Sequence, residues 1–493
     1  MSNNNSKQAF WVLFGTLSAF MFSIVSAMVL SRYFNKVDYG TYRQILYVYN
    51  SLLVIFTLGL PRTYSFFLPR VPIEEAKSVI KKINNILIAS GLCMGGIIYF
   101  GAELIANLLN NNELINPLRY FSLVPIFLLP TLALEGILAT YKKTQLLAFY
   151  NIATKILLLV FVVTPVVFMG GGVVSAILGF SVASFISFLL AAFLKYWPIK
   201  KITPVTTSLS YKEIFNYAIP IFIAGFWAIL ISSSDQFFIS RYFGAEVFAE
   251  FANGALELPF VSMVVAATTI VLAPIYSKKA FDGSAKAKEE IIQLWHSVLS
   301  KTIKITYPLI AFFYCFADMV MVALYGQAYV NSGEYFEIKL LVNFFTIVAF
   351  GPLLLSIGGN KYYYRVHMYG AIVLIALQAL SVLFISSPIA LVWVSVICQI
   401  GRILAMLLFV AKYFDVKLYQ LFSWAVIAKL TPCFIILYAI KYGILFFIEV
   451  SNVFFILSTA AILYLILFVI WAYIAKLDYL SIIKPLLKRI PSK

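Results

Sequence analysis

The chain has 493 residues, of which 62% are hydrophobic and 12% are charged, and its mean hydropathy is +0.95. A soluble domain needs a polar exterior and does not reach these values, so the composition excludes a soluble protein and predicts a polytopic membrane protein. The net charge of +17 would suit a nucleic-acid partner, but the basic residues are distributed over short connections between apolar segments, so we expect no nucleic-acid binding.

Fourteen apolar segments are long enough to cross a bilayer as helices. They are residues 9–31, 42–68, 83–109, 118–140, 146–169, 173–195, 217–240, 251–276, 298–325, 336–358, 368–386, 388–411, 424–447 and 453–476. The tightest connections are Gly170-Gly171-Gly172 and Ser386-Ser387-Pro388, whose turn chemistry predicts short hairpins. The first segment has no small-residue cleavage site, so we expect a retained helix.

Charge predicts the orientation of these helices, because cytoplasmic loops collect Lys and Arg. With the amino terminus inside, most basic residues fall in inner loops, and few, among them Lys36, Arg43 and Lys441, fall in outer loops. We therefore predict that both termini are cytoplasmic. The inner connections IEEAKSVIKK and GSAKAKEEIIQLW are typical of amphipathic helices that lie on anionic lipid.

A short motif recurs in the two halves of the chain. Ser31-Arg32-Tyr33-Phe34 is repeated 209 residues later as Ser240-Arg241-Tyr242-Phe243, each time at the predicted outer end of a spanning helix. Six helices separate the copies, so both halves have the same orientation and are related by an axis along the membrane normal. We predict a bundle over residues 1–210, a second over 211–420, a linker at 196–213, and two additional helices with a cytoplasmic tail over 421–493.

The sequence resembles the polysaccharide and oligosaccharide (O-unit, Wzx-type) flippases of the multidrug/oligosaccharidyl-lipid/polysaccharide exporter superfamily. The stretches that carry the resemblance are Leu30-Ser31-Arg32-Tyr33-Phe34, Tyr39-Gly40-Thr41-Tyr42, Leu58-Gly59-Leu60-Pro61, Asn216-Tyr217-Ala218-Ile219-Pro220, the run from Asp235 to Ala245, and Pro274-Ile275-Tyr276-Ser277-Lys278. The pattern departs at Phe248-Ala249-Glu250-Phe251, which replaces the Tyr-Gly-x-Tyr seen at Tyr39.

The resemblance implies an all-α integral membrane protein with about fourteen transmembrane helices, in which two MATE-like six-helix bundles are followed by two C-terminal helices. It implies a flippase, not an enzyme, that moves an undecaprenyl-pyrophosphate-linked oligosaccharide of O antigen, capsule or exopolysaccharide across the bacterial inner membrane by alternating access. The implied partners are the polyprenyl-linked oligosaccharide, membrane lipids, a coupling H⁺ or Na⁺, and polysaccharide polymerase components.

Three other functions remain open. A lipid II flippase and a cation-coupled multidrug exporter share the implied fold, and a membrane polysaccharide polymerase or ligase uses the same lipid-linked sugars. The last needs a large outer catalytic loop, whereas every predicted outer loop here is short and lacks His.

Cations inside or beside the spans are the candidate ligands for a pyrophosphate or acidic sugar. Lys155 and Arg402 lie about nine residues, ~14 Å, from the inner ends of their helices, which is too deep for snorkelling. Arg62 follows Pro61 near the inner end of the second helix, and Arg32 and Arg241 are equivalent outer positions in the repeat. The alternatives are a Lys155 pair with Glu135, a plain topogenic charge at Arg62, and capping by the two repeat arginines.

Four carboxylates are candidates for coupling or gating, namely Asp235, Glu257, Asp318 and Glu135. Asp235 follows Ser232, Ser233 and Ser234 in the seventh span, and Glu257 and Asp318 are expected in the outer halves of the eighth and ninth spans. Protonation of a buried carboxylate could couple a gradient to closure, although a fixed pair of Asp235 with Arg241 fits the sequence equally. We expect no cofactor and no metal site, and we expect the four cysteines to be buried structural thiols.

Overall fold

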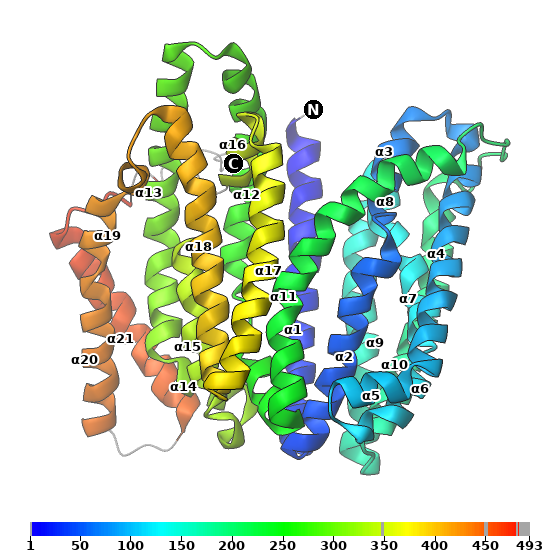
Figure 1. Ribbon diagram of the computed structural model, residues 1–493, viewed down its shortest axis with the longest axis horizontal. Coiled ribbons are helices and arrows are strands. Elements are labelled where there is room, and N and C mark those ends of the chain that lie inside the picture. The colour runs from blue at the N-terminus through cyan, green and yellow to red at the C-terminus, as the bar shows by residue number, and fades with distance from the viewer. Residues whose placement is uncertain (1, 347–349, 448–451, 480–481, 483–493) are drawn as a thin grey trace, which may run out of the picture. The chain divides into compact units, whose positions relative to one another are not determined.

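The computed structural model describes residues 2–346, 350–447, 452–479 and 482 of the chain. All regular structure in these residues is helical (Figure 1). A helix satisfies its backbone N–H and C=O groups internally, as a hydrocarbon environment requires. In this part of the chain twelve helices are long and apolar enough to span a membrane, and a bent pair raises the number to thirteen. The predicted all-α membrane fold is therefore confirmed.

Contacts divide the chain into two compact units, residues 1–250 and 251–493, here called the N-terminal unit and the C-terminal unit. The helices of the N-terminal unit are α1 (Ser2–Tyr33), α2 (Lys36–Thr57), α3 (Pro61–Phe67), α4 (Ala76–Phe100), α5 (Ala102–Leu108), α6 (Ile115–Phe121), α7 (Val124–Leu128), α8 (Ala133–Thr140), α9 (Thr144–Met169), α10 (Val173–Tyr196) and α11 (Tyr211–Gly254), the last of which ends just beyond the unit.

The C-terminal unit contains the helices from α12 onward. They are α12 (Pro259–Asp282), α13 (Ala285–Cys315), α14 (Ala317–Tyr325), α15 (Ser332–Leu340), α16 (Phe350–Ser356), α17 (Asn360–Phe384), α18 (Pro388–Phe414), α19 (Trp424–Leu430), α20 (Pro432–Phe447) and α21 (Val453–Ile474). Short 3₁₀ helices connect several of these elements in both units: η1 (Leu68–Arg70), η2 (Ile73–Glu75), η3 (Asn112–Leu114), η4 (Leu129–Leu132), η5 (Trp197–Ile199), η6 (Gln327–Tyr329), η7 (Leu341–Phe344) and η8 (Leu418–Leu421).

The boundary between the two units by packing, at 250/251, differs from the boundary at 210/211 that the repeat predicts. A repeat identifies equivalent elements, whereas packing records which helix surfaces touch. The division into 1–210, 211–420 and 421–493 therefore stays a prediction.

The predicted hairpins are present. Helix α9 ends at Met169 and α10 begins at Val173, with Gly170 in the left-handed conformation between them. Helix α17 ends at Phe384 and α18 begins at Pro388.

Several predicted spans differ from the structure, among them the eighth, the ninth and the tenth. The eighth begins at Pro259, and not at 251, because residues 251–254 continue α11. The ninth is broken at Phe316, where α13 and α14 meet at 74°. The tenth consists of short helices, α15, η7 and α16, and residues 347–349 within it lie outside the described residues.

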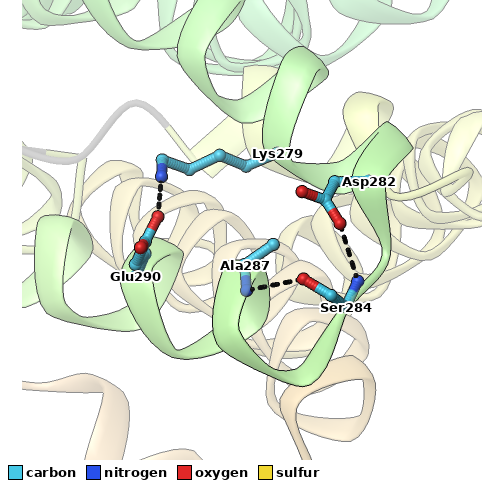
Figure 2. A network of polar contacts seen from close by, with 5 residues as sticks. All are labelled: Lys279, Asp282, Ser284, Ala287 and Glu290. Atoms are coloured by element: carbon cyan, nitrogen blue, oxygen red, sulfur yellow. Dashed lines mark hydrogen bonds and ion pairs between the residues drawn. The ribbon is translucent and has the colours of Figure 1, made fainter.

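The two inner connections are also different from the prediction. IEEAKSVIKK forms η2 and the first turns of α4, and GSAKAKEEIIQLW begins α13, so both run directly into spanning helices. Figure 2 shows the turn before α13, where Ser284 Oγ accepts a hydrogen bond from the N–H of Ala287 at 3.1 Å and Lys279 pairs with Glu290. Ser284 caps α13, and the ion pair of Lys279 with Glu290 joins the two helices on either side of the turn. The charges of Lys279 and Glu290 therefore have local structural partners.

Helix α11 changes direction at Gly244, whose φ of 83° and ψ of 177° are not helical. Such a backbone conformation is accessible essentially to glycine alone. The kink separates a long arm, residues 211–243, from a short arm, residues 245–254 (Figure 1). The short arm follows the second copy of the repeat motif, as the start of α2 follows the first copy, and these two stretches are here called the elbows.

Candidate functional site

A cavity of about 230 Å³ lies among α1, α2, α9 and α10 of the N-terminal unit. Its polar lining residues are Ser23 and Ser26 of α1, Tyr39, Tyr42 and Arg43 of α2, and Lys155 of α9. The remaining lining is mainly aliphatic and aromatic. An anion in this cavity would therefore meet two cationic side chains and several hydroxyl groups.

Lys155 lies eleven residues after Thr144, about 17 Å along the axis of α9. Its side chain is half-buried and lines the cavity. Glu135, its candidate partner, is exposed in α8, and the ion pairs among the described residues do not join the two. The structure thus supports the cavity position of Lys155 over the structural pair.

Arg43, which is expected from the sequence in an outer loop, is a second cation of this cavity. Its Nη1 donates a hydrogen bond to the hydroxyl of Tyr39 at 3.0 Å, and Tyr39 is fully buried. Helix α2 begins at Lys36 because the side chain of Asn35 accepts the N–H of Asp38 at 2.8 Å and caps the helix. An Asn three residues before an Asp is a helix-start signal that could have moved the predicted start of this span from residue 42 to residue 36.

A buried polar network joins α2 to the long arm of α11. Gln44 Nε2 donates to Ser240 Oγ at 2.7 Å, and Gln44 Oε1 accepts from Asn111 Nδ2 at 2.6 Å. The same amide of Asn111 donates to Thr41 Oγ1 at 3.0 Å. Ser240 belongs to the second copy of the repeat motif, and Gln44 and Thr41 lie just after the first copy. The network therefore brings the two copies of the elbow together.

Two further contacts hold these elbows in place. Lys36 Nζ lies 2.7 Å from Glu250 Oε1 and 3.5 Å from Glu246 Oε1, both on the short arm of α11. At Gly40 the helices approach so closely that a Cβ would lie 1.9 Å from the carbonyl oxygen of Ala245. Only a glycine allows this approach.

The other predicted cations are dispersed. Arg241 donates to the backbone oxygen of Asn107, which fits capping of the elbow, whereas Arg32 is exposed at the end of α1 and Arg62 is exposed in α3. Arg402 is half-buried in α18 of the C-terminal unit, packed so tightly on Gly370 that a Cβ there would lie 2.5 Å from Arg402 Cδ. Their proposed roles in substrate binding stay predictions.

The predicted carboxylates also occupy different environments. Asp235 is buried in α11. Asp318 forms an ion pair with Lys441 at 2.8 Å, and Lys441 lies inside α20 and not in an outer loop as expected. Glu257 is exposed in the loop between α11 and α12, so its predicted place in a span is wrong. The reason is that α11 continues to Gly254 and Pro259 starts the next helix.

No group of His, Cys, Asp and Glu in the described ranges could hold a metal ion. The four cysteines form no disulfide within the described residues; Cys315 and Cys433 are buried as expected, Cys398 is half-buried, and Cys93 is exposed on α4. An exposed side chain on a spanning helix points away from the helix bundle. The prediction of a buried thiol is therefore wrong for Cys93.

Residues 29–334, more than half of the chain, match the family described as polysaccharide biosynthesis protein. The chain belongs to this family. No curated protein matches the sequence of this chain.

Solved structures show its fold. The lipid II flippase MurJ in an inward closed conformation superposes with a TM-score of 0.70 at 16% identity, over 94% of this chain and 98% of that one. An inward-facing multidrug resistance MATE transporter of the MOP superfamily superposes with a TM-score of 0.61 at 13% identity, over 83% of this chain and 98% of that one. A MATE transporter from Vibrio cholerae superposes with a TM-score of 0.55 at 13% identity, over 85% of this chain and 98% of that one. The chain is thus a multi-pass membrane protein with the fold that these structures share, as predicted.

Proposed function

We propose that this protein is a flippase that moves an undecaprenyl-pyrophosphate-linked oligosaccharide from the inner to the outer leaflet of the bacterial cytoplasmic membrane. The observation that carries the proposal is Lys155, a cation far inside a spanning helix whose side chain lines a cavity together with Arg43 and several hydroxyl groups. A charged side chain at this depth costs several kcal/mol unless it faces water or an opposite charge, so its retention there favours an anionic substrate.

The cavity offers the groups that a phosphate-bearing substrate requires. Arg43 and Lys155 provide positive charge, and the serine and tyrosine hydroxyls provide donors for phosphate and sugar oxygens. The polyprenyl tail need not enter, because it is soluble in the hydrocarbon of the membrane. The headgroup alone requires a lined, wet path.

The packed elbows support an alternating-access cycle. The Gln44–Ser240 and Lys36–Glu250 contacts hold together the ends of α2 and α11 that we predict to face outward. A carrier that opens to one side at a time needs such a seal while it is open to the other side. Separation of these contacts would then accompany release of the headgroup on the outer side.

Among the alternatives, a cation-coupled exporter of cationic drugs fits the cavity less well, since Lys155 and Arg43 would repel the cargo. A lipid II flippase fits the cavity chemistry equally and differs in the sugar attached to the pyrophosphate. A polymerase or ligase has less support, because the predicted outer loops are short.

Deletion of the gene tests the function. We expect lipid-linked oligosaccharide to accumulate in the inner leaflet while its synthesis continues, and surface polysaccharide to be lost. Normal surface polysaccharide in the deletion strain would refute the proposal. Loss of viability with accumulation of lipid II would instead identify a lipid II flippase.

Substitutions at Lys155 test the cavity. Lys155→Glu should abolish surface polysaccharide and Lys155→Arg should retain it, at equal amounts of protein in the membrane. The matched control is Lys143→Glu, a charge reversal at an exposed lysine in the turn before α9. Full activity of Lys155→Glu would exclude an anion-binding role for this residue.

A further inference from the structure

The connection between η5 and α11 is not a loose linker. Residues 200–210, here called the strap, lie along the first turns of α4 and are held there by side chains of that helix. From the sequence alone, the basic side chains of this α4 segment are expected to be topogenic or lipid-facing charges. In the structure, several of them bind backbone carbonyl groups of the strap.

The first half of the strap is held by Lys77 and Ser78. Lys77 Nζ donates to the carbonyl oxygens of Ile202 at 2.6 Å and Lys200 at 3.2 Å. Ser78 Oγ donates to the carbonyl oxygen of Val205 at 2.6 Å, and the N–H of Val205 donates to the carbonyl of Glu74 at 3.0 Å. The backbone of Val205 is therefore bound through both of its polar groups.

The second half of the strap leads directly into α11 and is held by Lys82. Lys82 Nζ donates to the carbonyl oxygen of Leu209 and lies 4.7 Å from the ring centroid of Tyr211, the first residue of α11. Ser210 and Glu213 form a reciprocal cap, since Ser210 N–H donates to Glu213 Oε2 at 2.7 Å and Glu213 N–H donates to Ser210 Oγ at 3.2 Å. The start of α11 is thus determined by contacts of the strap.

Apolar packing reinforces these polar contacts. Leu209 of the strap and Ile214 and Ala218 of α11 are buried in one hydrophobic core with residues of α3, α4 and α8. The members of this core from α4 include Val79, Ile80 and Ile83, which alternate with the strap-binding residues along the helix. One face of α4 therefore binds the strap and the adjoining face binds α11.

The long arm of α11 follows α2 and α3 from this anchor to the elbow. The rings of Tyr217 and Phe66 stack with centroids 3.8 Å apart, and a Cβ on Gly59 would lie 2.6 Å from the carbonyl oxygen of Ala218. At the other end, Gln44 binds Ser240. The long arm is therefore attached to the N-terminal unit at both ends.

We propose that Lys77, Ser78 and Lys82 are positioning residues of the transporter, which hold the inner end of α11 against α4 so that its Ser232–Asp235 segment keeps its register beside α2. This proposal rests on the proposed function only for its effect on transport. Hydrogen bonds from an ammonium group to carbonyl oxygens are among the stronger kinds in proteins, and a docked strap fixes the helix that follows it.

Lys81 provides the matched control for this proposal. It lies beside Lys82 on α4 and has the same charge, but it is exposed, and the contacts of the described residues give its side chain no partner. If the lysines of α4 act only as charges at the membrane surface, replacement of Lys81 and of Lys82 should have equal effects. If they position the strap, only replacement of Lys77 and Lys82 should release the strap and reduce transport.

Hydrogen exchange of the full chain in lipid nanodiscs tests the strap without any substrate. In the Lys77→Met/Lys82→Met variant we expect the hydrogen-bonded strap amides of Val205, Leu209 and Ser210 to exchange about tenfold faster or more, which corresponds to about 1.4 kcal/mol. Lys81→Met should leave them unchanged, and Lys77→Arg/Lys82→Arg should restore slow exchange. Unchanged exchange in the double Met variant would overturn the proposal.

A transport assay on the same variants tests the positioning role. We expect surface polysaccharide to fall at least severalfold in the double Met variant and to recover in the double Arg variant, at equal membrane levels. Faster exchange of the strap amides together with normal transport would show that the strap is only a structural connection, and would refute the positioning role. Absence of any polysaccharide defect in the gene deletion would refute the proposed function and leave the exchange result valid.

Discussion

Gln44 of α2 donates a hydrogen bond from Nε2 to Oγ of Ser240 in α11 at 2.7 Å, and both side chains are fully buried. The two residues are 196 positions apart, and each lies in or just after one copy of the repeat motif. A pair of this kind in a dry environment is costly to break on one side only, because the remaining partner stays unsatisfied.

Substitution of Gln44 by Leu tests this pair. It leaves Ser240 Oγ and the amide of Asn111 without this partner, so we expect a loss of about 1–3 kcal/mol in the free energy of unfolding, measured in nanodiscs. Ser232→Ala is the control, since its exposed hydroxyl binds only a carbonyl of its own helix. Equal stability of Gln44→Leu and the control would contradict a buried network.

Gly40→Ala tests the close approach of the elbows. A Cβ at this position would lie 1.9 Å from the oxygen of Ala245, so α2 and the short arm of α11 must separate. We expect destabilisation by about 1–3 kcal/mol together with impaired transport. Gly96→Ala in α4, where no atom lies within 4 Å of the added Cβ, should be neutral or stabilising. A neutral Gly40→Ala would show that the elbows do not pack this closely.

Gly244→Ala tests the kink by backbone strain alone. No atom lies within 4 Å of a Cβ at Gly244, but its φ of 83° disfavours any L-residue with a side chain. We expect a cost of about 1–3 kcal/mol in thermal or denaturant unfolding. Gly443→Ala in α20 is equally open and has no positive φ, and it should cost nothing. Indistinguishable results for the two variants would indicate that α11 does not need the kink.

Lys441→Met tests an anchor within the C-terminal unit. Lys441 Nζ donates to Asp318 Oδ1 at 2.8 Å and to the carbonyl of Cys315 at 2.9 Å, at the bend between α13 and α14. Because the Asp318 side chain is 46% exposed, solvent weakens the ion pair and we expect a loss of only about 1 kcal/mol. Lys429→Met, at an exposed lysine of α19, is the control. In a double-mutant cycle with Asp318→Asn, strict additivity would exclude a coupling between the two side chains.

Much of the fold follows from local features of the chain. Apolar length predicts the spanning helices, and glycine and proline predict the hairpins at 170–172 and 386–388, because both signals depend on a few consecutive residues. The repeated Ser-Arg-Tyr-Phe motif identifies the equivalent ends of α1 and of the long arm of α11. The depth of Lys155 is also local information, because it needs only the two ends of one helix.

The sequence by itself therefore determined the class of protein, the helices and the depth of the intramembrane charge. Only the tertiary structure decided that Arg43 shares a cavity with Lys155, that Gln44 binds Ser240, and that Lys77 and Lys82 bind the strap. The physical reason is that a membrane-spanning helix is apolar on most of its surface, so its sequence carries little sign of which face meets lipid and which meets another helix. Partners separated by more than a hundred residues are defined only once the helices pack.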